Sequence, residues 1–102
     1  SCRKDVYHMR ESVVEKYLRK QAEAHGYLCY KFVSPAHNGV PDRVLIGHGL
    51  TFFVELKAPG KEPRLLQLRV IERIRNHGGT VYVIDSKEGV NELFKTLPSD
   101  LS

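Results

Sequence analysis

Two acids and a lysine, Asp42, Glu55 and Lys57, are the side chains whose types and spacing are best suited to chemistry. Glu55 and Lys57 lie in an apolar segment predicted to be a strand, where residues two apart point to the same face. Charged groups on a buried strand cost free energy unless a partner satisfies them. A divalent cation is such a partner, because Mg²⁺ binds one or two carboxylates together with water and phosphate oxygens.

Asp42 is predicted to approach Glu55 from the other arm of a hairpin, formed by strands 43–46 and 51–57 and a turn at 47–49. Lys57 would then lie beside a metal-bound water, where it could orient that water or offset charge developing on a phosphate. The simpler alternative is a Glu55–Lys57 ion pair on a solvated sheet face. The apolar neighbours of Glu55, the position of Asp42 and the basic charge of the chain favour the metal site.

The first predicted helix, residues 6–25, offers a further acid. Its apolar residues fall on one side at 3.6 residues per turn, with Glu11 inside that apolar arc and Glu15 at its edge. An acid on a core-facing side usually has a partner. Either glutamate could be a third acid at the metal site, and the alternatives are a salt bridge to Lys57 or an edge position reaching solvent.

The second predicted helix, residues 63–77, has Pro63 at its first position and ends at Gly78-Gly79. Gln67 lies on its apolar side, with Arg64 in the same first turn. Gln67 could be a core amide bonded to the backbone, or it could reach with Arg64 toward a substrate. Helix N-termini also attract phosphate groups.

The remaining elements predict an α/β fold. A strand at 27–33 precedes the loop 34–42, and a strand at 80–85 precedes a short helix at 87–97 that Ser86 could cap. The order is α-β-β-β-α-β-α, and the strands at 51–57 and 80–85 should be parallel, joined by a right-handed crossover. The run at 81–84 is apolar on both faces, which predicts a strand covered on both sides.

Length and charge narrow the class of protein. The 102 residues predict one domain, 1–102, and exclude a multidomain machine, while no apolar run is long enough for a membrane helix. Two cysteines form no disulfide framework and fit a reducing, cytoplasmic compartment. The net charge is +4, concentrated in residues 1–31 and 57–77, which suggests an anionic partner. No zinc spacing, P-loop or nucleophile elbow occurs.

Four stretches together resemble the VRR-NUC domain of the PD-(D/E)xK nuclease superfamily, which includes stand-alone phage and bacterial proteins. They are Gly-Val-Pro-Asp-Arg at 39–43, Phe-Val-Glu-Leu-Lys-Ala-Pro-Gly at 53–60, Gln67, and Gly-Gly-Thr-Val-Tyr-Val-Ile-Asp-Ser at 78–86. The superfamily motif alone is weak, whereas this combination is specific and spans nearly the whole chain. The resemblance implies a small restriction-endonuclease-like sandwich around a central mixed sheet.

The resemblance also implies residue roles. Asp42 and Glu55 match the motif acids, Lys57 the motif lysine, and the backbone carbonyl of Leu56 a position that often ligates the metal. Glu11, Glu15, Leu18 and Gly26 fit a run common in the family and favour Glu11 as the helix-one acid. Spacing in related junction resolvases favours Glu15 instead, and both are kept.

The resemblance implies a Mg²⁺- or Mn²⁺-dependent, structure-specific endodeoxyribonuclease, and because stand-alone members resemble Holliday-junction resolvases, we expect a homodimer that cuts four-way junctions. A two-fold symmetric enzyme presents two sites to two symmetric strands, and a small core favours pairing. Helix one and the apolar residues Leu65, Leu66 and Val70 are candidate pairing surfaces. The alternatives are a nuclease for flaps, nicks or plain duplex, and a non-catalytic junction-binding module. The cations available for phosphate contacts are Lys31, Arg43, Lys61, Arg64 and Arg69.

Overall fold

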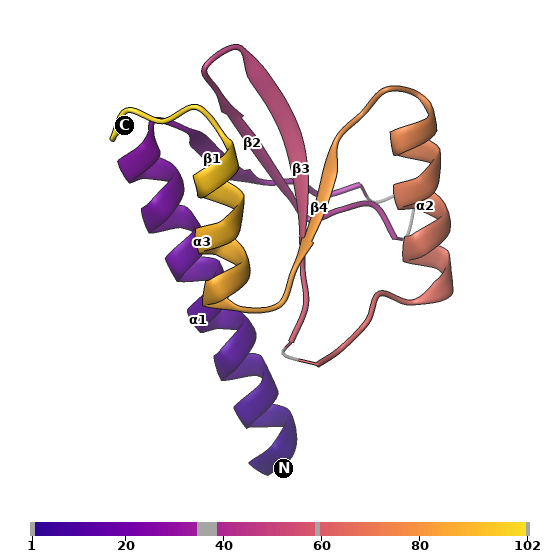
Figure 1. Ribbon diagram of the computed structural model, residues 1–102. Helices are drawn as coiled ribbons and strands as arrows, with labels where there is room; N and C mark the ends of the chain where they lie inside the picture. The colour runs from indigo at the N-terminus through magenta and orange to yellow at the C-terminus, as the bar shows by residue number, and fades with distance from the viewer. Residues whose placement is uncertain (1, 35–38, 59, 102) are drawn as a thin grey trace.

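The computed structural model describes residues 2–34, 39–58 and 60–101, with side chains from residue 12 onward. Its elements follow the predicted order, and Figure 1 shows their arrangement. They are α1 (Cys2–His25), β1 (Leu28–Lys31), β2 (Arg43–Gly47), β3 (Leu50–Leu56), α2 (Leu65–Asn76), β4 (Val81–Ile84) and α3 (Lys87–Thr96).

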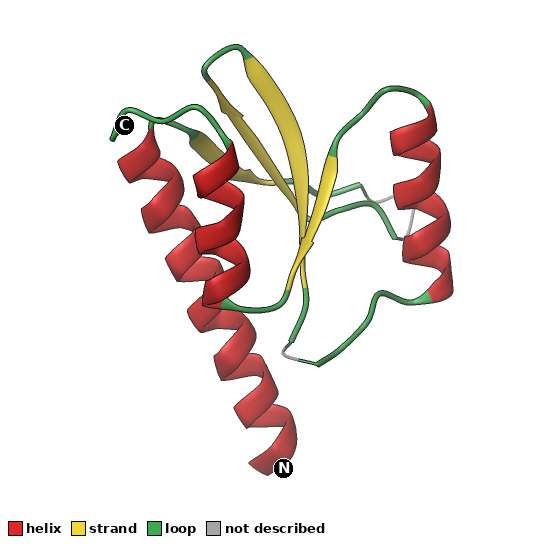
Figure 2. Ribbon diagram, viewed as in Figure 1, coloured by secondary structure: helices red, strands yellow, loops and turns green. Residues whose placement is uncertain are grey.

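The strands form one mixed sheet in the order β1-β2-β3-β4 (Figure 2). The β1–β2 and β2–β3 pairs are antiparallel, whereas β3 and β4 are parallel and joined through α2. The β2–β3 hairpin turns at His48 and Gly49, whose φ angles of 52° and 79° are both positive, as a tight turn between twisted strands requires. The predicted hairpin and the predicted parallel crossover are both confirmed.

The main core lies between α1, α3 and one face of the sheet. Figure 1 shows these two helices side by side on one side of the sheet and α2 on the other. Alternate residues of β3 point into this core, as expected for a strand. The buried apolar side chains include Val14, Leu18 and Ala22 of α1, Leu45 of β2, Phe52, Val54 and Leu56 of β3, and Val90, Leu93 and Phe94 of α3.

The opposite face of the sheet is covered less completely. Ile71 of α2 is buried there, but Val83 of β4 is 40% exposed. The prediction that strand 81–84 is covered on both sides is therefore wrong at Val83. The physical reason is that β4 is an edge strand of the sheet, and α2, the helix on that side, leaves this side chain open to solvent.

Two predicted helix starts differ from those observed. The helix predicted at 63–77 begins at Leu65, because Arg64 keeps an extended conformation (φ −66°, ψ 159°) as the N-cap residue and Pro63 precedes it. The first helix begins at Cys2 rather than at residue 6, and its N-terminal end projects beyond the sheet in Figure 1. Ser86 caps α3 as predicted, since its hydroxyl accepts a hydrogen bond from the Gly89 N–H at 3.0 Å.

Candidate active site

The strand register places Asp42 level with Glu55. Arg43 pairs with Val54 across the antiparallel β2–β3 ladder, so the residue before Arg43 meets the residue after Val54. The Phe32 N–H donates to the Asp42 carbonyl oxygen at 2.8 Å, which extends the β1–β2 pairing to Asp42. Directly opposed residues of an antiparallel pair share one face of the sheet. The fold therefore brings the two motif acids together.

Both acids are withdrawn from solvent. Glu55 is 4% exposed and is the only charged residue among the buried ones in the described part of the chain. Oδ1 of Asp42 is also buried, and it accepts no hydrogen bond from any described residue. Burying a carboxylate oxygen without a donor is costly. A solvated sheet face, the simpler reading of Glu55, is therefore contradicted, and the orphaned Oδ1 fits a cation ligand.

Lys57 continues strand β3 beyond its last paired residue. Its N–H donates to the Ile84 carbonyl oxygen at 2.9 Å, so the backbone stays in the β3–β4 ladder. The alternation of a strand then places the half-buried Lys57 on the same face as Glu55, while the Leu56 side chain packs in the main core. A backbone carbonyl is the polar acceptor that Leu56 could offer to a metal, and this role stays a prediction.

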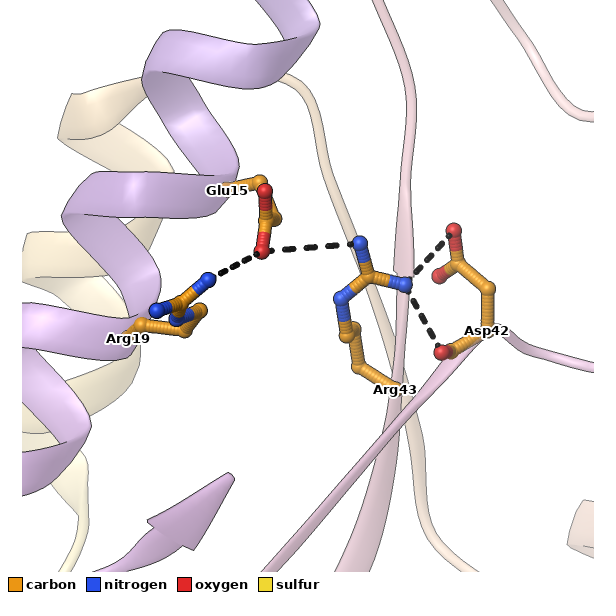
Figure 3. A network of polar contacts seen from close by, with 4 residues as sticks. All are labelled: Glu15, Arg19, Asp42 and Arg43. Atoms are coloured by element: carbon orange, nitrogen blue, oxygen red, sulfur yellow. Dashed lines mark hydrogen bonds and ion pairs between the residues drawn. The ribbon is translucent and has the colours of Figure 1, made fainter. Parts of the chain in front are cut away.

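Arg43 links the motif aspartate to the first helix (Figure 3). Its Nη1 donates to the Asp42 carbonyl oxygen at 2.9 Å and lies 3.4 Å from Asp42 Oδ2. Its Nη2 lies 3.7 Å from Oε1 of Glu15, which also pairs with Arg19 at 3.3 Å. The predicted partner of a helix-one acid was Lys57 or a metal. The structure instead places Glu15 against Arg43.

The first turn of α2 packs against the loop that leads to Asp42. Oε1 of Gln67 accepts a hydrogen bond from the Arg64 N–H at 2.9 Å, so its amide oxygen caps the helix. A Cβ at Gly39, which has a φ of +88°, would meet the Cα and N of Gln67 at 3.2 Å. The backbone of Gly39, three residues before Asp42, therefore packs directly against the backbone of Gln67. Gln67 is half-buried and is held near the site by this contact.

Comparisons with known proteins bear on the family and the fold of the chain. No family model matches the chain. A solved structure described as "VRR_NUC domain" superposes with a TM-score of 0.80 and 35% identity, covering 85% of this chain and 96% of that one. The curated "Putative nuclease p44" of Acyrthosiphon pisum secondary endosymbiont phage 1 is 44% identical over 81 residues, which are 78% of this chain and 87% of that protein.

The chain belongs to the VRR-NUC family of nucleases. The resemblance read from the motifs and the predicted α/β fold are thereby confirmed. Within the described helices of this VRR-NUC domain, none is both long and apolar enough to cross a membrane.

The other predicted site residues of the VRR-NUC domain fall into two groups. Lys31, Lys61 and Arg64 are exposed, whereas the Arg43 side chain is only 12% exposed. The Glu11 side chain lies outside the described residues. The link from Arg43 to Glu15 was missed by sequence reasoning, although the edge position of Glu15 on its helix was a signal that it had a partner.

The donor set can also be compared with what a metal requires. Among the described side chains, no three His, Cys, Asp or Glu residues form a group that could hold a metal ion by themselves. Two carboxylates fit Mg²⁺ or Mn²⁺, because hard cations of this size keep several water ligands and take substrate phosphate oxygens. The residues present therefore fit such a cation and lack the nitrogen and sulfur ligands of a zinc site.

Proposed function

We propose that this VRR-NUC domain is a metal-dependent, structure-specific endodeoxyribonuclease that hydrolyses phosphodiester bonds in branched DNA, above all in four-way junctions. One observation carries the metal-dependent nuclease reading: Asp42 and Glu55 are opposed on neighbouring strands, and Lys57 follows on the same face. The carboxylates of Asp42 and Glu55 would supply a cation site, and the amine of Lys57 would supply a positive charge on the same face of the sheet. Such a set is suited to phosphoryl chemistry.

Each residue has a distinct task in this proposal. Asp42 and Glu55, with the Leu56 carbonyl, would hold Mg²⁺ or Mn²⁺. The cation, when bound, would make water a better nucleophile at neutral pH and stabilise negative charge on the phosphate. Lys57 would direct its side-chain amine to the site, where it would orient the attacking water or offset the charge that develops on the phosphate oxygens. The backbone of Gln67 contacts Gly39 in the loop that leads to Asp42, and its side-chain N–H would help to orient the substrate.

The third acid is assigned to Glu11 in this scheme. Glu15 already faces two guanidinium groups, those of Arg43 and Arg19, which account for its charge. Glu11 lies four residues earlier in α1, and its side chain lies outside the described residues. The family pattern and the apolar arc of the helix both favoured this residue.

DNA would be held through its phosphates. Lys31, Lys61 and Arg64 are exposed, and Arg64 is the N-cap residue of α2. Contacts of this kind position a nucleic acid but read no bases, so a preference for branched DNA would come from its shape. Their expected signature is a steep loss of affinity with rising salt concentration.

The proposal includes a homodimer, because two symmetric strands of a junction need two sites. Of the predicted pairing residues, Leu65 and Leu66 are exposed in the first turn of α2, and Val70 is half-buried. Light scattering at the concentration used for cleavage measures the mass directly. A single-chain mass under conditions of paired cutting would contradict the dimer.

The deciding experiment compares cleavage of a labelled four-way junction with that of a linear duplex of matched sequence. Wild type, Lys57→Ala and the control Lys95→Ala are each assayed with Mg²⁺, Mn²⁺ and EDTA. Lys95 is an exposed lysine paired with Glu92 in α3, so its loss should leave cleavage unchanged. We expect paired, metal-dependent cuts on the junction alone, abolished in Lys57→Ala and retained in Lys95→Ala.

Other outcomes separate the alternatives. Cuts on both substrates indicate a nuclease of different specificity, which flap and nick substrates would then define. Tight junction binding in EDTA, with no cuts under any condition, favours a binding module without catalysis. Normal cleavage by Lys57→Ala would remove Lys57 from the mechanism.

A further inference from the structure

The guanidinium of Arg43 contacts both the backbone and the side chain of the preceding residue. Nη1 donates to the Asp42 carbonyl oxygen at 2.9 Å and lies 3.4 Å from Oδ2 of the same residue. The other oxygen of that carboxylate, Oδ1, is buried and accepts no hydrogen bond from the described residues. The two carboxylate oxygens of Asp42 therefore differ. Oδ2 faces the guanidinium of Arg43, whereas Oδ1 has no donor among the described residues and could bind a metal.

We infer that Arg43 is a positioning residue that fixes the Asp42 carboxylate with Oδ1 presented to the metal, and that Glu15 holds Arg43 in place. This inference rests on the proposed metal-dependent function of Asp42. It differs from the expectation that Arg43 contacts a DNA phosphate. Arg43 acts through Asp42, and it needs no contact with the substrate or the metal.

The shape of the arginine side chain explains why this residue suits the task. A carboxylate rotates with little preference about its last torsion, so Asp42 alone does not fix which oxygen faces the cation. A planar guanidinium with several fixed donors restrains that rotation, whereas a lysine ammonium provides only a point charge on a flexible stem. Contact with the Asp42 carbonyl oxygen also ties the backbone, so the whole residue is held at the start of β2.

Glu15 completes the arrangement from the first helix. A cation that is only 12% exposed needs opposite charge nearby, and Glu15 lies 3.7 Å from Nη2, the end of the guanidinium that Asp42 does not use. Figure 3 shows the guanidinium lying between the two carboxylates. The packing of α1 on the sheet, through Val14 and Leu18, therefore sets the position of Glu15 and, through Arg43, that of Asp42.

The test measures Mn²⁺ affinity by calorimetry on protein without DNA, together with kcat and KM for cleavage of the junction. Arg43→Ala should weaken Mn²⁺ binding by about 10- to 100-fold, the usual effect of losing a residue that orients a metal ligand. The loss in cleavage should appear in kcat, with KM nearly unchanged. Arg43→Lys should recover only part of the affinity, and Glu15→Gln should weaken it less than Arg43→Ala does.

Arg64→Ala is the matched control, because Arg64 is an exposed arginine predicted to contact phosphate. It should raise KM and leave Mn²⁺ affinity unchanged. The same pattern in Arg43→Ala would overturn the inference and make Arg43 a phosphate contact. If Arg43→Ala does not fold, as circular dichroism would show, Arg43→Lys and Glu15→Gln decide: Mn²⁺ affinities equal to that of wild type in both would overturn it.

The two proposals fail in distinguishable ways. If the wild-type protein binds no Mn²⁺, the proposed function and this inference fall together. If wild type binds Mn²⁺ and Arg43→Ala binds it equally well, only the positioning role is refuted. A Glu15→Gln affinity as low as that of a variant lacking a motif acid would make Glu15 a direct ligand and would also refute it.

Discussion

Asp42 and Glu55 lie opposite each other across the β2–β3 pairing, although thirteen positions separate them in the sequence. The tight turn at His48 and Gly49 fixes this relationship, because the turn sets the register of the whole hairpin. A shift of one residue would move Glu55 into the apolar core and Val54 to the site. The same register therefore positions the candidate active site and buries Phe52 and Val54.

Glu55→Gln should abolish tight metal binding while keeping the fold. The amide has the size of the carboxylate but lacks the negative charge that a divalent cation requires. We expect Mn²⁺ affinity to fall by more than about tenfold. Losing a residue that only supports a metal ligand costs about 10- to 100-fold, and losing a ligand should cost at least as much. Calorimetry measures it, and Glu92→Gln is the control, since Glu92 is an exposed acid of α3. Equal affinity in Glu55→Gln and wild type would refute the metal assignment.

Gly39→Ala should destabilise the protein more than Gly49→Ala. Both glycines have positive φ angles, +88° and +79°, so each substitution incurs the strain of about 1 kcal/mol or more that an L-residue suffers there. At Gly39 the added Cβ would also press on the backbone of Gln67 and Leu66, whereas at Gly49 it meets nothing within 4 Å.

The difference between the two glycine variants should be about 1 kcal/mol in the free energy of unfolding, the scale of mild overpacking. Urea denaturation measures it. Gly39→Ala should also lower cleavage, because the contact with α2 positions the loop before Asp42. Equal stabilities and equal activities would show that the loop does not depend on this contact.

Gln67 can be tested for two roles at once. Gln67→Glu keeps an oxygen to accept from the Arg64 N–H and adds a negative charge near a helix N-terminus, so stability should be retained. It removes the side-chain N–H donor, so cleavage should fall if the amide orients the substrate. Gln67→Ala should lower both stability and cleavage, with a stability cost of about 0.5–1.5 kcal/mol for the lost hydrogen bond to the Arg64 N–H. Full activity in Gln67→Glu would limit Gln67 to capping.

The sequence predicted those parts of the site that depend on local pairing. Turn residues and alternation were sufficient to place Asp42 beside Glu55 and to give Lys57 the same face, because a hairpin is a local structure. Gln67 was recognised as a polar residue on an apolar side, but its hydrogen bond to Arg64 was not. That bond accompanies the extended backbone of Arg64, which is the N-cap residue, so the helix starts at Leu65 and not at Pro63.

Relationships between distant elements could not be predicted in the same way. The contact of Glu15 with Arg43 depends on where α1 crosses the sheet, and that position results from the packing of the whole core. The exposure of Val83 depends on how far α2 extends over β4, which an apolar pattern does not encode. Periodicity identifies the face of an element but does not identify what covers it.

Tyr27 should make stability fall at alkaline pH. Burial raises the pKa of the Tyr27 phenol above its ordinary value of 10.0, and the negative charges of Asp100 and of an ionised Tyr82 add to the effect. Its hydroxyl donates to the Pro98 carbonyl oxygen at 2.6 Å, which only the neutral form can do. The folded protein therefore keeps this proton at pH values where the unfolded chain has lost it.

A raised folded-state pKa gives a stability contribution that is complete below pH 10.0 and is lost as pH rises through the folded pKa. Tyr27→Phe lacks the ionisable group and should be less stable than wild type by about 0.5–1.5 kcal/mol at neutral pH, because it loses the hydrogen bond. The difference in free energy of unfolding should shrink above pH 10.0, because ionisation of Tyr27 in the unfolded chain lowers the stability of wild type alone. Urea denaturation at several pH values between 7 and 11 measures both curves. Parallel curves over this range would show that Tyr27 ionises equally readily in the folded and unfolded chains.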